Sequence, residues 1–225
     1  MKIAFVIPVR MNSSRLPGKC CLKIYKNFSL LDIIIARLST FFPNIPIIVA
    51  TSSKNHDDFI IHELSKYDLE IYRGSLNNVA ERFVNLCPRF DYLIRINGDN
   101  AFLDKNYIQE ALNFLELKKF KFISNVKIRS FPKGQSVEII NTTFFIKNFK
   151  NFKKNHLEHV FTYFYENWNP KIMKNIKNKG NLGHINLAID DSTDFLKAVK
   201  YYESIDSLKK PFNLKKYDES TIFNS

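Results

Sequence analysis

A loop rich in cations follows the first apolar segment of the chain. The loop contains five residues whose side chains can bind a ligand. They are two arginines, two serines and a lysine: Arg10, Ser13, Ser14, Arg15 and Lys19. Guanidinium and ammonium groups, small hydroxyls and backbone amides are the groups that hold phosphate oxygens in proteins. The glycine and lysine spacing of a Walker loop is absent. The pattern therefore indicates a triphosphate site of another kind, with a solvated basic loop as the alternative.

Two aspartates, each after a different apolar segment, add carboxylates to these cations. Asp99 follows residues 92–97, and Asp190 follows residues 182–189. Carboxylate oxygens are preferred ligands of Mg²⁺, which polarises phosphates for attack. Either aspartate alone is equally typical of a helix cap or a turn. The two of them together with a phosphate-binding loop predict a shared Mg²⁺ site.

The segments that must position these residues alternate between strand and helix patterns. Apolar runs predict strands at residues 2–8, 45–51, 69–72, 92–97 and 120–124, and helical patterns follow at 29–38, 57–67, 77–87 and 104–117. Strands that alternate with helices of this length imply parallel crossovers. The prediction is a three-layer α/β fold with a mostly parallel sheet, in which ligands bind at the carboxyl ends of the strands.

The alternation breaks between residues 125 and 183. This stretch and the segment after it hold a turn at 131–134, a strand-like run at 136–140, a helical pattern at 156–167, a returning strand at 182–189 and a helix capped by Ser192. We expect one domain over residues 1–205, with 125–183 as an inserted lid or dimerisation segment and 206–225 as a C-terminal tail.

The formal net charge is +12, from 34 Lys and Arg against 22 Asp and Glu. A basic chain suits nucleic acid, a membrane surface or small polyanionic substrates. No apolar run approaches the ~20 residues of a membrane span, and the N-terminus lacks a signal-peptide core. The three cysteines provide neither a disulfide framework nor zinc spacing. We therefore expect a cytoplasmic protein without a membrane partner.

The cationic loop also resembles a known family motif. Its pattern, Arg-x-x-Ser-x-Arg-Leu-Pro-Gly-Lys over residues 10–19, resembles the N-terminal motif of the cytidylyltransferases that make CMP-activated acidic sugars. The similarity is greatest to the spore-coat polysaccharide biosynthesis protein F branch and extends to the 3-deoxy-manno-octulosonate cytidylyltransferases. Further blocks match in order along the chain, at residues 49–52, 73–75, 82–83, 95–99, 103–104, 134, 137–138, 158–160, 189–190 and 194. Departures stand at Pro8, Asn12, Asn97 and Ala101-Phe102.

The resemblance implies a Rossmann-like nucleotide-diphospho-sugar transferase fold and a homodimer. It implies an enzyme that uses Mg²⁺ to transfer CMP from CTP to a sugar acid or related anionic acceptor, releasing pyrophosphate, for surface polysaccharide synthesis. The residues expected to bind the nucleotide are Arg10, Ser13, Ser14, Arg15, Lys19, Ala50, Thr51, Arg73, Ser75, Arg82, Asn97 and Asp99. Among these, the catalytic residues are Arg10, Arg15, Lys19 and Asp99. Lys133, Glu138 and His159 are expected at the acceptor, and Asp99 and Asp190 at the metal.

Two other functions stay open at this level. A nucleotide-sugar-dependent glycosyltransferase also uses paired carboxylates, and the Asn97-Gly98-Asp99 triplet resembles its metal motif. A basic nucleic-acid-binding protein would account for the charge, although no helix-turn-helix, RNA-recognition or zinc motif is present. Structural roles compete as well: an ion pair for Arg82, a turn for Lys133 and a structural histidine at position 159.

Overall fold

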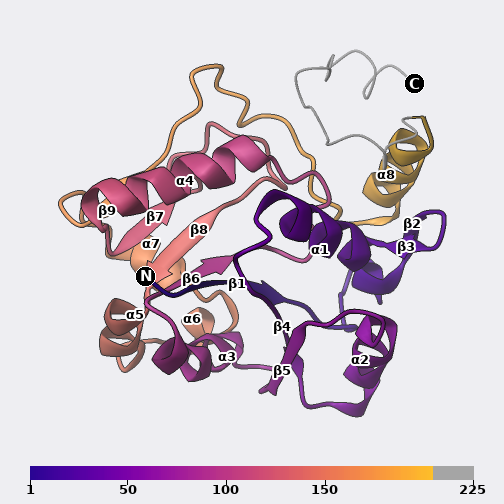
Figure 1. Ribbon diagram of the computed structural model, residues 1–225, viewed down its shortest axis with the longest axis horizontal. Helices are drawn as coiled ribbons and strands as arrows, with labels where there is room; N and C mark the ends of the chain where they lie inside the picture. Colours follow the sequence, from indigo (N-terminus) through magenta and orange to yellow (C-terminus); the bar gives the residue numbers. More distant parts are fainter. Residues whose placement is uncertain (205–225) are drawn as a thin grey trace.

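The computed structural model of the chain describes residues 1–204. The expected tail at 206–225 lies outside the described residues. A seven-stranded sheet forms the centre (Figure 1), with strands in the spatial order β5 (Glu70–Gly74), β4 (Ile47–Ser52), β1 (Ile3–Pro8), β6 (Tyr92–Arg95), β8 (Glu138–Asn141), β7 (Phe122–Ser124) and β9 (Met173–Asn175). Among the seven strands of this sheet only β8 runs antiparallel to its neighbours, so the prediction of a mostly parallel sheet is confirmed.

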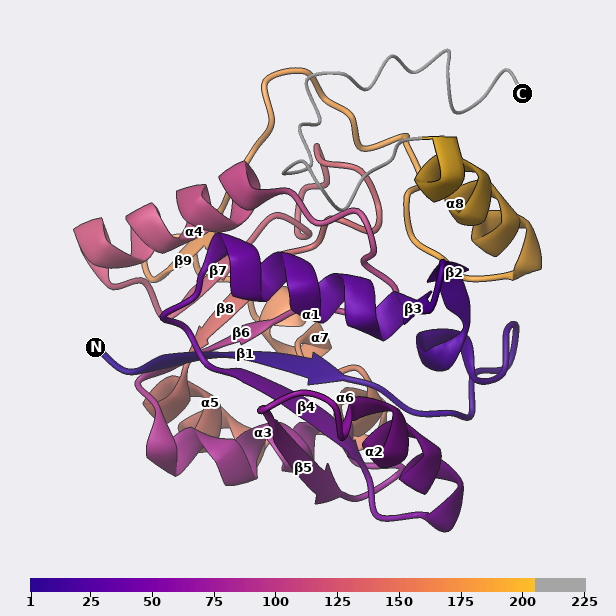
Figure 2. The ribbon, with the colours of Figure 1, turned by 45° about the vertical axis from the view of Figure 1, so that its right-hand side comes forward.

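Helices cover both faces of the sheet (Figure 2). One face carries α1 (Leu30–Phe41), α4 (Lys105–Lys118) and α8 (Ser192–Ser204), and α2 (Asp58–Leu64) adds apolar side chains to the same core. The other face carries α3 (Val79–Leu86), α5 (Thr142–Phe149) and α7 (Thr162–Glu166), with α6 (Lys154–Glu158) against α3. Alternate residues of β1 enter the two cores, Phe5 the first and Val6 the second, as the two-residue period of a strand requires.

Short elements connect these layers. They are the hairpin of β2 (Lys23–Tyr25) and β3 (Phe28–Ser29) and the 3₁₀ turns η1 (Lys19–Cys21), η2 (Asn55–Asp57) and η3 (Cys87–Arg89). The hairpin leads directly into α1, which starts with a capping box. Asp32 N donates to Ser29 Oγ (3.1 Å), and Ser29 N donates to Asp32 Oδ2 (2.7 Å). This confirms Ser29 as the cap and explains why the apolar pattern becomes helical there.

The segment 125–183, expected as an insert, is built into the layers of the sheet. It supplies β8 and β9 and the helices α5 to α7, whose aromatic side chains form much of the second core. The single helix expected at 156–167 is divided into α6 and α7, because Val160 and Phe161 between them turn into that core and are 1% and 0% exposed.

The returning strand expected at 182–189 is wrong. Within the described residues this segment forms one isolated bridge, between Lys133 and Asn186. Its apolar residues, among them Leu187 and Ile189, are buried in the first core instead of joining a ladder. The following helix is capped one residue earlier than expected, since Asp194 N donates to Asp191 Oδ1 (3.0 Å).

Candidate active site

The cationic loop extends from the carboxyl end of β1, at the centre of the sheet. Val9 N donates to Ala50 O at 3.1 Å, so the loop starts beside the end of β4. Met11 O then accepts from two later amides of the loop, Ser13 N at 3.0 Å and Gly18 N at 2.7 Å. The loop is therefore folded back on itself, and its last residue, Lys19, returns toward the carboxyl edge.

Three cations converge on one buried carboxylate at this edge. The Asp190 side chain is 8% exposed, and Arg15 Nη2 lies 3.1 Å from its Oδ1. Lys19 Nζ lies 3.4 Å from the same oxygen, and Lys133 Nζ lies 2.6 Å from Oδ2. Burial by itself raises the pKa of Asp190, but the hydrogen bond from Lys133 and the charges of Lys19 and Arg15 outweigh burial and lower this pKa. Asp190 is therefore an anion at neutral pH.

Asp99 lies next to this cluster. Lys19 Nζ is 3.7 Å from Asp99 Oδ2, and Ile189 N donates to Asp99 O at 3.2 Å, so the two aspartates are joined through both backbone and side chain. The Asn100 side chain, with its nitrogen toward Asp99, donates to Oδ1 at 2.9 Å. Burial raises the pKa of Asp99, and the negative charge of Asp190 adds to this, while Lys19 partly offsets it.

Two glycines allow the close backbone approaches behind these groups. A Cβ on Gly98 would lie 2.6 Å from Val9 Cγ1, so only glycine lets the β6 loop pack against the β1 loop. Gly134 has φ +91°, and a Cβ there would lie 2.4 Å from Ala188 N. This contact sets the backbone of Lys133 against the segment that leads to Asp190.

The donor set at this edge fits a divalent cation. Asp99 and Asp190 both approach the same point charge, Lys19 Nζ, within 4 Å. One or two carboxylates are the protein share that Mg²⁺ commonly takes when phosphates and water complete its shell. Within residues 1–204 no set of three or more His, Cys, Asp or Glu side chains is placed for a metal.

Arg10 lies apart from the Asp190 cluster. Its Nη2 donates to Glu158 Oε1 of α6 at 2.7 Å. Ser13 is half-buried and Ser14 is exposed on the loop, and Asn97 is half-buried after β6. The structure therefore places all of the expected phosphate-binding residues at one edge of the sheet. Their cations are divided: Arg15 and Lys19 lie at the two aspartates, and Arg10 lies at Glu158.

The residues expected on the base side occupy the ends of β4 and β5. Arg73 donates to Ser52 O (3.1 Å) and pairs with Asp58 (2.7 Å), and Ser75 Oγ accepts from Asn78 N (3.1 Å). Thr51 is fully buried and its Oγ1 has no partner among the described residues.

Arg82 and Ala50 contact other parts of the protein. Ala50 is 0% exposed, and its carbonyl accepts from Arg82 Nη1 at 3.0 Å. Arg82 is 1% exposed and also donates to Ser75 O at 2.8 Å and Leu76 O at 3.3 Å. Its guanidinium thus joins backbone of the β4 and β5 loops, which makes it a residue that positions the loops. The alternative role of Arg82, a structural ion pair, is not formed within the described residues.

The expected acceptor residues are placed differently from one another. Lys133 reaches the Asp190 cluster. Glu138 is 3% exposed, and its carboxylate lies 3.2 Å from Arg95 Nη1 and accepts from Tyr165 Oη. His159 is exposed directly after α6, beside Glu158 in the chain.

Asp57 is a residue that the sequence analysis missed. It is fully buried, and its Oδ1 accepts from Met11 N of the cationic loop at 2.8 Å. Its Oδ2 accepts from Ser52 N at 3.2 Å and from Ser52 Oγ. The available signal is a carboxylate in the loop that follows a buried strand, at the position where the sequence pattern predicts the start of the helix 57–67.

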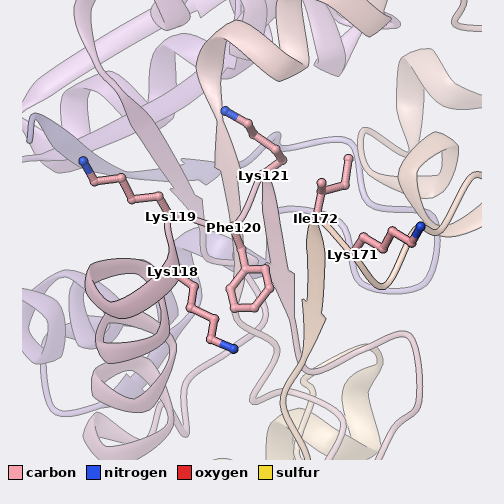
Figure 3. Close-up of a pocket in the computed structure, with 6 residues that line it drawn as sticks. All are labelled: Lys118, Lys119, Phe120, Lys121, Lys171 and Ile172. Atoms are coloured by element: carbon pink, nitrogen blue, oxygen red, sulfur yellow. The ribbon is translucent and has the colours of Figure 1, made fainter.

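A pocket of about 290 Å³ lies at the opposite edge of the sheet, before the first residues of β7 and β9. It is lined by Lys118, Lys119, Phe120, Lys121, Lys171 and Ile172. In Figure 3 the four ammonium groups point in different directions. Because they do not point to a common position, we assign no anion-binding site to this pocket.

None of the helices described in residues 1–204 is long and apolar enough to cross a membrane.

Comparison with known proteins agrees with this geometry. The chain matches the family model of the cytidylyltransferases over residues 4–213. It is 31% identical over 219 residues to the uncharacterized protein MJ1063 of Methanocaldococcus jannaschii, covering 91% of this chain and 86% of that protein. It is 30% identical over 171 residues to the spore coat polysaccharide biosynthesis protein SpsF of Bacillus subtilis, covering 72% of this chain and 69% of that protein.

Solved structures share the fold. A cytidylyltransferase from Leptospira borgpetersenii superposes with a TM-score of 0.88 at 24% identity, covering 99% of this chain and 96% of that chain. CMP:2-keto-3-deoxy-manno-octonic acid synthetase, solved in complex with CTP, has a TM-score of 0.65 at 13% identity, covering 91% of this chain and 99% of that chain. The Rossmann-like fold expected from the sequence is therefore confirmed. The chain belongs to the cytidylyltransferase family and is a nucleotidyltransferase.

Proposed function

We propose that the protein transfers CMP from CTP to a sugar acid or related anionic acceptor, with Mg²⁺ and with release of pyrophosphate, for surface polysaccharide synthesis. The observation that carries the proposal is the convergence of Arg15, Lys19 and Lys133 on Asp190 beside Asp99. An anionic nucleotide and an anionic acceptor repel one another, so their reaction needs cations and a metal at the same point.

The reaction joins an acceptor oxygen to the α-phosphorus of CTP. The bond from the α-phosphorus to the bridging oxygen breaks, pyrophosphate leaves with the electron pair of that bond, and the acceptor hydroxyl releases its proton to water. Asp99 and Asp190 would hold Mg²⁺, which polarises the α-phosphate when bound. Arg15 and Lys19 would then exchange Asp190 for phosphate oxygens, and they would neutralise the charge that develops on pyrophosphate.

Lys133 and His159, the residue that directly follows α6, would bind the acceptor. Lys133 is 49% exposed and follows the Phe131-Pro132 turn, so its ammonium can reach a carboxylate outside the Asp190 cluster. The presence of SpsF among the relatives supports an acceptor for a polysaccharide. The homodimer stays a prediction, which size-exclusion chromatography with light scattering checks.

The test is pyrophosphate release with each nucleoside triphosphate, with and without Mg²⁺, against a panel of sugar acids and phosphorylated or phosphonylated acceptors. We expect release with CTP and one acceptor class, and loss of release when EDTA removes Mg²⁺. In the active pair, Asp99→Asn and Arg15→Ala should each lower turnover ~100-fold, by loss of charge stabilisation. Release with another triphosphate, or none with CTP and any acceptor, would overturn the proposal.

A further inference from the structure

The cation that lies apart from the Asp190 cluster has a carboxylate of its own. Arg10 Nη2 and Glu158 Oε1 are 2.7 Å apart, although the residues are 148 positions apart in the sequence. Their side chains are 36% and 50% exposed. The pair thus joins the loop after β1 to the end of α6 at the surface of the site, where a ligand can reach it.

Both partners lie on anchored backbone. Arg10 precedes Met11, whose amide Asp57 holds. Glu158 ends α6, and α6 is fixed by His156, which is 2% exposed and whose Nδ1 accepts from Lys153 N at 2.9 Å. The contact is therefore set by the fold, and only the two side chains need to move to open it.

The charges around Arg10 explain why an anion is placed there. Arg82 lies behind the same loop and is bound by carbonyl oxygens. Burial lowers the pKa of Arg82, and the positive charge of Arg10 lowers it further. The two guanidinium groups therefore repel one another, and the carboxylate of Glu158 offsets part of that repulsion when no substrate is bound.

We propose that Glu158 lowers the affinity for polyphosphate by competing with the β- and γ-phosphates of the substrate for the Arg10 guanidinium. The inference rests on the proposed function, because Arg10 is expected to hold these phosphates. A polyphosphate displaces Glu158 from Arg10, and Glu158 returns to Arg10 as pyrophosphate leaves. An exposed ion pair is weak, so Glu158 reduces the affinity for polyphosphate without preventing binding.

The test is isothermal titration calorimetry on the full chain at low salt, with CTP, inorganic pyrophosphate and CMP as separate ligands. Glu158→Gln should lower the Kd of CTP and of pyrophosphate about 3- to 5-fold. The Kd of CMP should not change, because CMP lacks the β- and γ-phosphates. In an Arg10→Ala background the gain from Glu158→Gln should disappear, as the double-mutant cycle requires for a coupled pair.

Glu70→Gln is the matched control. Glu70 also pairs with an arginine, Arg89, and its side chain is 38% exposed, but it starts β5 at the opposite edge of the sheet. This variant should bind all three ligands as the wild type does.

An unchanged or higher Kd in Glu158→Gln would overturn the inference, as would an equal gain for CMP or in the Arg10→Ala background. A wild type that binds pyrophosphate but not CTP would contradict the proposed function alone, since the pyrophosphate titrations still decide the role of Glu158. A wild type that binds neither ligand would contradict both.

Discussion

Two buried aspartates contact the cationic loop, and their partners are of different kinds. Asp57 is 0% exposed and accepts from the Met11 amide and from the amide and hydroxyl of Ser52, with His56 Nε2 at 3.5 Å. Asp190 is 6% exposed and is surrounded by the side-chain cations of Arg15, Lys19 and Lys133. Burial would raise both pKa values, yet their partners lower both.

The type of partner separates a carboxylate of the scaffold from the one that we propose acts in the reaction. Backbone amides cannot leave Asp57 without unfolding the loop, so Asp57 belongs to the scaffold. The Arg15 and Lys133 side chains are 62% and 49% exposed, so they can exchange Asp190 for phosphate or acceptor oxygens at little cost. Burial and pKa direction are alike in the two residues, and the type of partner is what distinguishes them.

The largest expected effect is the loss of turnover when Asp190 is replaced. Asp190→Asn should lower turnover ~100-fold or more, because it removes a charged ligand from the proposed metal site. It should change the free energy of unfolding by less than about 1 kcal/mol, because its partners are side chains that regain solvent. Steady-state pyrophosphate release and urea denaturation measure the two quantities. Near-normal turnover would place Asp190 with Asp57 in the scaffold.

A substitution without a charge change comes next. Gly134→Ala should lower the free energy of unfolding by about 2 kcal/mol and reduce turnover, because φ +91° and the 2.4 Å approach to Ala188 N leave no room for a Cβ. Gly180→Ala is the control, since no atom lies within 3.4 Å of its added Cβ. Equal stability of the two variants by thermal denaturation would contradict this account.

Replacement of Asp57 should lower mainly the stability of the protein. Asp57→Asn should lower the free energy of unfolding by ~2 kcal/mol, since an amide cannot accept from both Met11 N and Ser52 through two oxygens. Turnover should fall less than in Asp190→Asn. The neighbouring Asp58→Asn serves as control, because Asp58 is 56% exposed and pairs only at the surface with Arg73, and we expect a change within about 0.5 kcal/mol.

The smallest effect is a pH dependence. The folded pKa of Asp57 is depressed, so its contribution to stability is complete above the ordinary Asp pKa of about 4. This contribution is lost as the pH falls through the lower folded value. The difference in unfolding free energy between wild type and Asp57→Asn should therefore narrow in urea titrations from pH 7 to pH 3. If the difference in unfolding free energy stays constant over this pH range, Asp57 does not contribute to the loss of stability in acid.

Local patterns determined much of this protein. The apolar runs and caps of the first 124 residues predicted the strands and helices of the sheet, because strand and helix periods and caps depend on neighbours within a few positions. The same reasoning predicts that Arg15, Lys19 and Asp99 lie close together, since polar groups after buried strands must meet at the carboxyl edge. Asp190 also lies there, but it follows the segment 182–189, which forms no strand within the described residues.

Only the tertiary structure decided which partner each charge takes. Lys133 meets Asp190 across 57 positions and Glu158 meets Arg10 across 148, so no local pattern contains either contact. The burial of Arg82 and the irregular path of 182–189 likewise depend on what the rest of the chain packs against them. Residue type and spacing specify which chemical groups are available, whereas the packing of distant segments decides which of these groups contact one another.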